Sequence, residues 1–278
     1  MTEAYQDHIG LLTDFGLKGQ HYVASMKGVI LQLNPNATIV DISHNVSSYS
    51  ILEAAYLMNS TYKYFPECTV FVIVVDPGVG SSREIIALKT IKNYYFVGPN
   101  NGLFPHIISK DKISDCVKVE NDNYFNKPVS RTFHGRDIMG PVGAHITLGV
   151  PLTNFGNSFD INNLVSLPID LRINEEKKKI LCTVQYIDNF GNVTTNVRLI
   201  GNSVEGYDLE LPLDCMLKFK INNRQISAKF VTHFSGVQRN KYLFLRGSSN
   251  FLELSKNQAN AAKDLDLKVG DTIEINLA

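Results

Sequence analysis

The segment Val70–Arg83, VFVIVVDPGVGSSR, decides the fold that the sequence predicts. It opens with six consecutive apolar residues, Val70 to Val75, and five of the six are β-branched. A short run of this kind, bounded by turn residues, is typical of a strand buried on both faces of a parallel sheet. Asp76 ends the run, and a glycine-rich turn leads to Arg83. We therefore expect a carboxylate at the carboxyl end of a core strand, the edge where open α/β sheets bind ligands.

The sequence around this strand alternates between strand and helix patterns. Apolar strands are predicted at Ile9–Thr13 and Thr38–Ile42, and helices at Tyr22–Leu33 and Tyr49–Phe65. A proline follows shortly after each helix pattern, as expected where a helix ends. The order strand, helix, strand, helix, strand predicts an α/β domain with a mainly parallel sheet flanked by helices. The elements expected next are strands at Glu84–Leu88, Tyr94–Val97 and Ile113–Val119, and a helix at His134–Leu148.

The pattern changes after the polar segment 154–168, where we place a domain boundary. Short strands separated by turn residues follow, which is typical of a small β-barrel or sandwich. One helix, Asn257–Leu265, interrupts them. The expected domains are thus an α/β domain at residues 1–165 and a smaller β-rich domain at 174–278. The strands predicted in the second domain are Ile180–Ile187, Val193–Leu199, Met216–Ile221, Gln225–Val231, Tyr242–Leu245 and Thr272–Ile275.

The composition narrows the class of protein. Of the 278 residues, 44% are hydrophobic, and 27 basic residues balance 27 acidic ones. A net charge of zero gives no electrostatic reason to expect nucleic acid or a membrane surface as a partner. The first residues lack the pattern of a signal peptide, and no apolar run approaches the roughly 20 residues of a membrane span. Four cysteines without metal-type spacing suit free thiols in a reducing cytosol, so we expect a soluble cytoplasmic protein.

Polar side chains follow several predicted strands at their carboxyl ends. Asp14 follows the first strand, Asp41 and His44 lie at the end of the second, and Asp76 follows the core strand. Parallel strands bring these ends to one edge, where carboxylates repel one another unless a cation or ligand hydroxyl groups pair with them. This favours a polar or cationic ligand. Each of these residues can equally be a turn or cap residue bonded to nearby backbone amides.

A second polar group begins the predicted helix at His134. Asp137 in its first turn favours the helix dipole, and His134 and Arg83 can each have a structural role. A metal site built from Asp14, Asp76, His134 and Asp137 is conceivable, but no H-x-H or H-E-x-x-H spacing supports it. Because that spacing is absent, no metal is expected. The acid that starts the glycine-rich turn would also repel a phosphate, so no phosphate site is expected there.

Eight motifs in a fixed order give the chain a resemblance to a known enzyme family. The chain resembles the S-adenosyl-L-methionine hydroxide adenosyltransferases, relatives of the fluorinating and chlorinating enzymes that act on the same substrate. The resemblance implies hydrolysis of S-adenosyl-L-methionine to adenosine and L-methionine by in-line attack of water on the 5′ carbon, without a cofactor. The motifs are LLTDFG (11–16), MKGVI (26–30), NPNATIVDISH (34–44), VVDPGVGSSR (74–83), PNNGLF (99–104), FHGRDIMGPVGAH (133–145), DNFGNVTTN (188–196) and GSSNFLELSKNQANAA (247–262).

The resemblance also implies roles for individual residues. Asp76, Arg83 and His134 match the set that holds and polarises the water, either Asp76 or His134 taking its proton, and Asp14 matches the ribose-binding aspartate. The family is generally a trimer with each site between one subunit's first domain and its neighbour's second, so we expect a homotrimer. The matches in the second domain are Asp188 for the methionine ammonium, Phe190 and Asn192 around the adenine, and Ser248, Ser249 and Asn257 in the motif that closes over the substrate.

Two positions depart from the family pattern. Gln20 stands where many members carry an aspartate, and Asn100 stands where hydrolytic members often carry one, as it does in the halogenating relatives. Those relatives lack the set of Asp76, Arg83 and His134, so its presence favours water over halide. The alternatives are a halide adenosyltransferase that forms 5′-halo-5′-deoxyadenosine, a non-catalytic protein that binds adenosine or S-adenosylmethionine, and a metal-dependent hydrolase.

Overall fold

The predicted core strand is β3 (Val70–Val74) of a six-stranded sheet in the computed structural model of the chain. All five of its residues are buried. Val72 packs into the core on one face of the sheet, and Phe71 and Ile73 pack into the core on the other. The prediction of a strand buried on both faces is confirmed.

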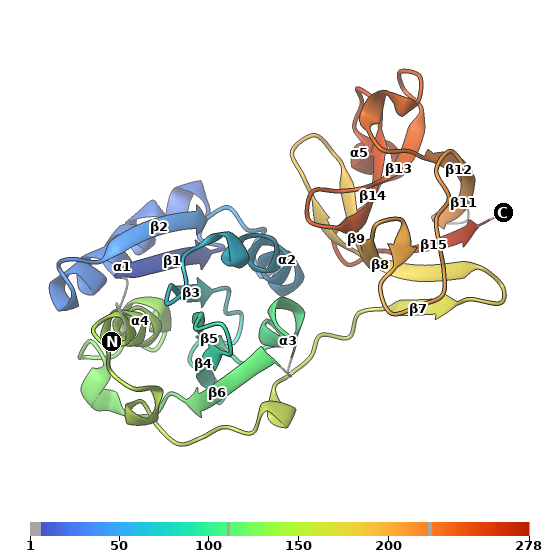
Figure 1. Cartoon of the computed structure of the whole chain (residues 1–278). Helices are drawn as coiled ribbons and strands as arrows, with labels where there is room; N and C mark the ends of the chain where they lie inside the picture. Colours follow the sequence, from blue (N-terminus) through green and yellow to red (C-terminus); the bar gives the residue numbers. More distant parts are fainter. Residues whose placement is uncertain (1–6, 110–111, 222–223, 278) are drawn as a thin grey trace. The chain divides into compact units, whose positions relative to one another are not determined.

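The structure describes residues 7–109, 112–221 and 224–277, which form two units, one ending at Leu167 and the other beginning at Pro168 (Figure 1). Among these residues, none of the helices has the length and apolar character that crossing a membrane requires.

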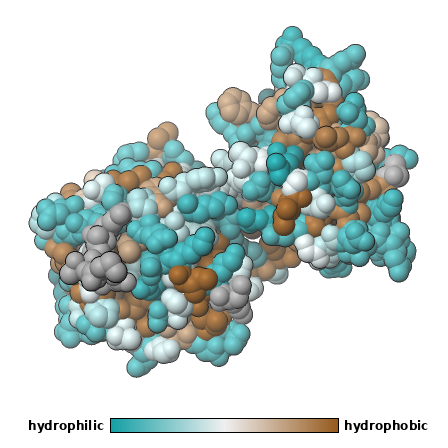
Figure 2. All heavy atoms as spheres, in the orientation of Figure 1, coloured by the Kyte–Doolittle hydropathy of each residue, from teal (hydrophilic) through white to brown (hydrophobic). Residues whose placement is uncertain are grey.

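Burial raises the pKa of the Cys116 and Cys182 thiols to about 12, so neither is a thiolate nucleophile near neutral pH. The face drawn in Figure 2 is largely hydrophilic, with apolar residues in small groups.

The sheet of the first unit is mixed, so the prediction of a mainly parallel sheet is not confirmed. Its strand order is β2-β1-β3-β5-β4-β6. The first four are parallel, whereas β4 runs antiparallel to both β5 and β6. Only residues 91–94 join β4 to β5, and so short a connection makes a hairpin because parallel strands need a crossover of roughly a dozen residues or more. The other strands are β1 (His8–Thr13), β2 (Thr38–Ser43), β4 (Ile85–Thr90), β5 (Tyr95–Pro99) and β6 (Ile113–Lys118).

Helices cover both faces of this sheet. α1 (Gln20–Leu33) and α4 (Gly140–Thr147) share one core with it, and α2 (Ile51–Thr61) and α3 (Phe104–Ile107) share the other. The flanking helices of the prediction are thereby confirmed. The helix expected from His134 begins instead as a π-helix, Gly135–Met139, and becomes α-helical at α4.

Gly135 explains how closely this π-helix approaches β3. A Cβ atom at Gly135 would lie 2.9 Å from Val74 Cγ1 and 3.2 Å from Met26 Sδ. Only a residue without a side chain fits between the strand and α1. The helix start is thus pressed against the end of β3, directly beside Asp76.

The second unit is a closed barrel, which confirms the β-rich prediction. The strands β9-β14-β13-β12-β11-β15-β8 follow one another, and β8 pairs with β9 to close the ring around an apolar core. The expected helix Asn257–Leu265 is shorter, α5 (Ala261–Leu265), because the Asn260 side chain accepts from Lys263 N and caps it. The strands are β7 (Leu171–Asn174), β8 (Lys179–Ile187), β9 (Val193–Ile200), β10 (Ser203–Val204), β11 (Met216–Ile221), β12 (Arg224–Phe230), β13 (Tyr242–Arg246), β14 (Phe251–Lys256) and β15 (Thr272–Leu277).

Candidate active site

Arg83 contacts both Asp76 and His134 at the carboxyl edge of the first sheet. Arg83 Nε donates to Asp76 Oδ1 (2.9 Å), and Arg83 Nη2 donates to Asp76 Oδ2. The same Nη2 lies 2.9 Å from His134 Nδ1. The side chains of Asp76 and Arg83 are only 4% and 11% exposed. A two-bonded ion pair of this kind is strong and fixed in direction, so Arg83 holds Asp76 in one orientation while it also contacts His134.

The contact with Arg83 fixes the tautomer of His134. A guanidinium can only donate, so His134 Nδ1 must accept, and the neutral ring carries its proton on Nε2. Burial first, and then the charge of Arg83, lower the pKa of His134 from its ordinary value of 6.5, against weaker opposing effects of Asp76 and Asp137. His134 is therefore neutral near pH 7 and presents an N–H donor.

The turn between Asp76 and Arg83 is held by its own backbone and by a neighbouring loop. Val79 N donates to the Asp76 carbonyl (3.2 Å). Gly80 has φ +79°, and a Cβ there would lie 2.5 Å from the Arg131 carbonyl oxygen. This position needs glycine for both reasons. The turn and the loop at Arg131 are thus in direct backbone contact.

Asp14 lies at the same edge, directly after β1. Its Oδ2 accepts from Tyr49 N (2.8 Å). Tyr49 has φ +67°, a left-handed conformation that is uncommon for a bulky residue, and the residue is 71% exposed. Asp14 therefore stabilises a strained backbone that presents an aromatic ring beside the site. No periodicity in the sequence marks Tyr49.

These residues line one cavity of about 260 Å³, whose walls include Asp14, Tyr49, Asp76, Phe133 and His134. Ligand sites that enclose a drug-sized molecule measure roughly 300–1,000 Å³. The cavity is therefore large enough for only part of such a ligand. A larger cavity, about 520 Å³, lies along β4 and β6 and includes none of these residues, so we place the site at the smaller one.

In the second unit, Asp188, Phe190 and Asn192 form one compact loop. Asp188 Oδ1 accepts from the backbone N–H groups of Phe190 and Asn192, both at 2.9 Å, and Oδ2 accepts from Asn192 Nδ2 (2.8 Å). Ala262 N donates to the Gly191 carbonyl (3.0 Å), which fixes the loop against α5. The Phe190 side chain is 77% exposed. A rigid loop thus presents an aromatic ring that can stack on a flat ligand.

The other predicted residues of the second unit lie at the two ends of β14. Ser248 and Ser249 are in the turn before the strand, where Ser248 is exposed. Asn257 follows the strand, is 9% exposed, and donates from Nδ2 to the Val237 carbonyl (2.8 Å). The Asn257 side-chain amide therefore supports the loop at Val237.

Glu253 on β14 is a residue that sequence reasoning missed. Its Oε2 lies 3.0 Å from the position of a Cβ on Gly247, and its Oε1 accepts from Ser255 Oγ (2.9 Å). Burial and then the charge of Asp188 raise its pKa, against the bond from Ser255. Glu253 thus adds a second carboxyl group near Asp188 and the turn at Gly247. Glu253 lies in a strand with alternating apolar residues, and that pattern does not predict a carboxyl group near Asp188.

The two residues that depart from the family pattern lie at opposite levels of burial. Gln20 is exposed at the start of α1. Asn100 is 5% exposed, and its Oδ1 accepts from Val165 N (2.9 Å). Asn100 therefore anchors the segment at Val165, and this bond accounts for an asparagine at the position without a role in halide binding. Among the described residues, no three His, Cys, Asp or Glu side chains are grouped so that they could hold a metal ion.

Comparison with known proteins places the chain in a family. Residues 9–156 match the SAM hydroxide adenosyltransferase N-terminal domain, and residues 182–274 match the C-terminal domain. The chain belongs to the SAM hydroxide adenosyltransferase family. Its relatives include an (R)-S-adenosyl-L-methionine hydrolase of Methanocaldococcus jannaschii, 37% identical over 99% of this chain and 98% of the relative.

Other relatives are less similar to the chain, and some of them carry a different name. A fluorinase of an Actinoplanes species is 25% identical over 97% of both chains. An (R)-S-adenosyl-L-methionine hydrolase of Thermus thermophilus is 30% identical over 95% of this chain and 97% of that one. Among solved structures, an uncharacterized conserved protein of Thermotoga maritima has a TM-score of 0.86 and 35% identity, covering 96% of this chain and 99% of its own.

Proposed function

We propose that this protein hydrolyses S-adenosyl-L-methionine to adenosine and L-methionine. The observation that carries the proposal is the intact contact set of Asp76, Arg83 and His134 in a chain that matches the M. jannaschii hydrolase over nearly its whole length. Water attacks the 5′ carbon in line with the sulfonium. The new C–O bond forms as the C–S bond breaks. The electron pair of the C–S bond stays on sulfur, so methionine departs as a neutral thioether that needs no general acid.

Asp76 is the group that takes the proton of the attacking water in this proposal. His134 Nδ1 already accepts from Arg83, so the neutral ring offers only its Nε2–H to the water. Each Asp76 oxygen that is bonded to Arg83 keeps a second lone pair. His134 then holds the water oxygen, and Asp76 accepts the proton. Holding the water in line is worth up to roughly 7–11 kcal/mol of the barrier.

In this proposal, residues of the first unit and of the second unit both bind the rest of the substrate. Asp14 binds the ribose hydroxyl groups, Asp188 the methionine ammonium, and Phe190 and Asn192 the adenine. Ser248, Ser249 and Asn257 lie in the segments that close over the substrate. The cavity of about 260 Å³ supports a shared site because it holds only part of this ligand. We accordingly infer a cytoplasmic homotrimer with domains 1–165 and 174–278, each site formed between one subunit's first domain and its neighbour's second.

The function is tested by incubating the protein with S-adenosylmethionine and identifying the nucleoside released by chromatography and mass spectrometry. The expected products are adenosine and methionine in equal amounts, formed equally with and without chloride and with and without a chelator. Chloride-dependent 5′-chloro-5′-deoxyadenosine without adenosine would establish a halide adenosyltransferase instead. Tight adenosine binding without turnover would establish a binding protein.

Acid is expected to inhibit this reaction through His134. Because the folded protein holds the pKa of His134 below 6.5, kcat/KM should be flat above about pH 6.5 and fall only at lower pH. Protonation puts a hydrogen on Nδ1, which then faces the Arg83 donor. As pH falls, His134 is protonated in the unfolded chain before it is protonated in the folded protein, because its pKa is lower in the folded protein. The stability that neutral His134 contributes is therefore present above pH 6.5 and is lost as pH falls through the folded pKa. A pH–rate profile checks this, and an acid limb unchanged in His134→Gln would contradict it.

A further inference from the structure

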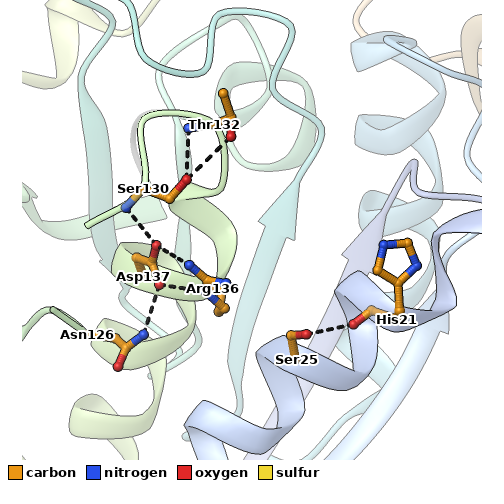
Figure 3. Close-up of polar contacts among 7 residues, drawn as sticks. All are labelled: His21, Ser25, Asn126, Ser130, Thr132, Arg136 and Asp137. Atoms are coloured by element: carbon orange, nitrogen blue, oxygen red, sulfur yellow. Dashed lines mark hydrogen bonds and ion pairs between the residues drawn. The ribbon is translucent and has the colours of Figure 1, made fainter. Parts of the chain in front are cut away.

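Asp137 is a fully buried carboxylate next to the proposed water site, with a side chain that is 0% exposed. Burying a charge is costly unless it is paired and hydrogen-bonded. Its Oδ1 accepts from Asn126 Nδ2 (2.9 Å) and Arg136 Nε (2.7 Å), and its Oδ2 accepts from Ser130 N and Arg136 Nη2, both at 2.8 Å (Figure 3). These bonds, with the Arg136 charge, lower its pKa despite burial. Asp137 is therefore an ionised anchor.

The bonds of Asp137 attach the loop 126–132 to the π-helix. The backbone N–H of Asn126 also donates to the Asp137 carbonyl (2.9 Å), so Asn126 is held by both backbone and side chain. Ser130 Oγ accepts from Thr132 N (3.2 Å). Thr132 lines the site cavity, and the Arg131 carbonyl of this loop packs against the turn that carries Asp76. A displacement of Asp137 would thus be transmitted to the cavity wall.

Asp137 also fixes the aromatic residue that precedes His134. Its N–H donates to the Phe133 carbonyl (3.2 Å), and the Arg136 guanidinium that it orients lies 5.1 Å from the centroid of the Phe133 ring. That ring packs edge-on against Phe15 at 5.8 Å and Tyr22 at 5.3 Å. Both neighbours of His134 in the chain are therefore restrained, one through Asp137 and the other, Gly135, against β3.

We propose that Asp137 is a positioning residue that holds His134 and the wall formed by Thr132 and Phe133 in register with Asp76. This rests on the hydrolase function proposed above. None of the groups proposed to bind the ribose, adenine or methionine lies in residues 126–133. A loss of positioning should therefore lower kcat while KM changes little.

The test is Asp137→Asn, which keeps the shape and removes the charge. An amide has one accepting oxygen, so its NH₂ group would face N–H donors that now bond to the carboxylate. We expect kcat to fall by about 10-fold or more and KM to stay within about 3-fold, at a temperature where the variant is folded. The control is Thr147→Val, which removes two hydrogen bonds of a buried hydroxyl on α4, one to the Ala144 carbonyl and one from Asn34 Nδ2, and should lower stability without changing kcat.

A second readout does not depend on turnover. The imidazole signal of His134, assigned with His134→Gln, is followed by NMR as a function of pH. The groups facing His134 are Arg83, Asp76 and Asp137. In Asp137→Asn, loss of the negative charge alone moves the His134 titration to lower pH, whereas displacement of the ring from Arg83 and from its buried position moves it to higher pH. Asn126→Ala keeps the Asp137 charge, so a titration at higher pH than in wild type in that variant reports lost positioning. A wild-type protein without hydrolase activity would overturn the proposed function alone, because this signal still reports on positioning.

Asn126→Ala covers the case in which Asp137→Asn does not fold. It removes one donor and leaves the Arg136 ion pair, so the same fall in kcat is expected at a smaller size, about 3-fold. The proposal is overturned if kcat of the folded variants stays within about twofold of wild type, whatever the His134 signal does. It is also overturned if Thr147→Val, at equal loss of stability, lowers kcat equally.

Discussion

Replacement of Asp76 by asparagine is expected to lower kcat by about 10²–10⁴-fold, the range that a positioned proton acceptor contributes. The amide cannot take a proton from water, and it cannot accept from both Arg83 nitrogens that now bond to the carboxylate. Adenosine formation under saturating substrate measures the effect. Asp214→Asn is the matched control, because Asp214 is a 74% exposed carboxylate that also pairs with one cation, Lys229.

A further variant separates proton transfer from anchoring. In Asp76→Gly, added formate can occupy the vacated space and act as the base. If Asp76 accepts the proton, formate should restore part of kcat in this variant and leave wild type unchanged. A kcat for Asp76→Asn within about threefold of wild type would contradict the role altogether.

Arg83→Met is expected to remove activity and to lower the free energy of unfolding by about 3–5 kcal/mol, since it leaves the nearly buried Asp76 charge without its partner. His134 Nδ1 would lose its donor at the same time. Denaturant unfolding measures the loss of stability. Arg172→Met is the matched control, because its 77% exposed side chain pairs with Asp170 at the surface, where such pairs contribute about 0–1 kcal/mol.

The outcome for Arg83 bears on the site as a whole. A loss of stability below about 1 kcal/mol would show that water penetrates the pair and that the contact set is not preorganised. Arg83→Lys refines the result. Lysine keeps the charge but lacks the two-pronged geometry, so stability should partly recover while kcat stays low.

The sequence predicts where the strands lie, but it does not predict strand direction or unusual backbone conformations. Six apolar residues located β3 because burial on both faces leaves no alternation. The same reasoning missed the direction of β4, since apolar patterns do not distinguish parallel from antiparallel neighbours. The length of the connection at 91–94 contained that information.

The site could be predicted only in part for similar reasons. Asp76 and Arg83 lie on one predicted turn, but only the family resemblance joined His134 to them as one set, and the structure shows the contacts of Arg83 with both. The positive φ of Tyr49 depends on the Asp14 bond, which no local pattern encodes. Asp137 has the ordinary features of a helix first-turn acid, and only its complete burial reveals a different role.

The burial of β3 on both faces has a consequence for the timescale on which the site can open. Amide hydrogens of a strand enclosed by two cores exchange with solvent through global unfolding, whereas exposed turns open with little cost in free energy. Asp76 follows this strand after a single residue, and Gly135 is pressed against its last residue, Val74. We therefore expect the backbone at Asp76 and at the start of the His134 helix to exchange more slowly than the surrounding loops. Thermal fluctuation in the surrounding loops can then admit substrate and release adenosine without disturbing Asp76 and His134.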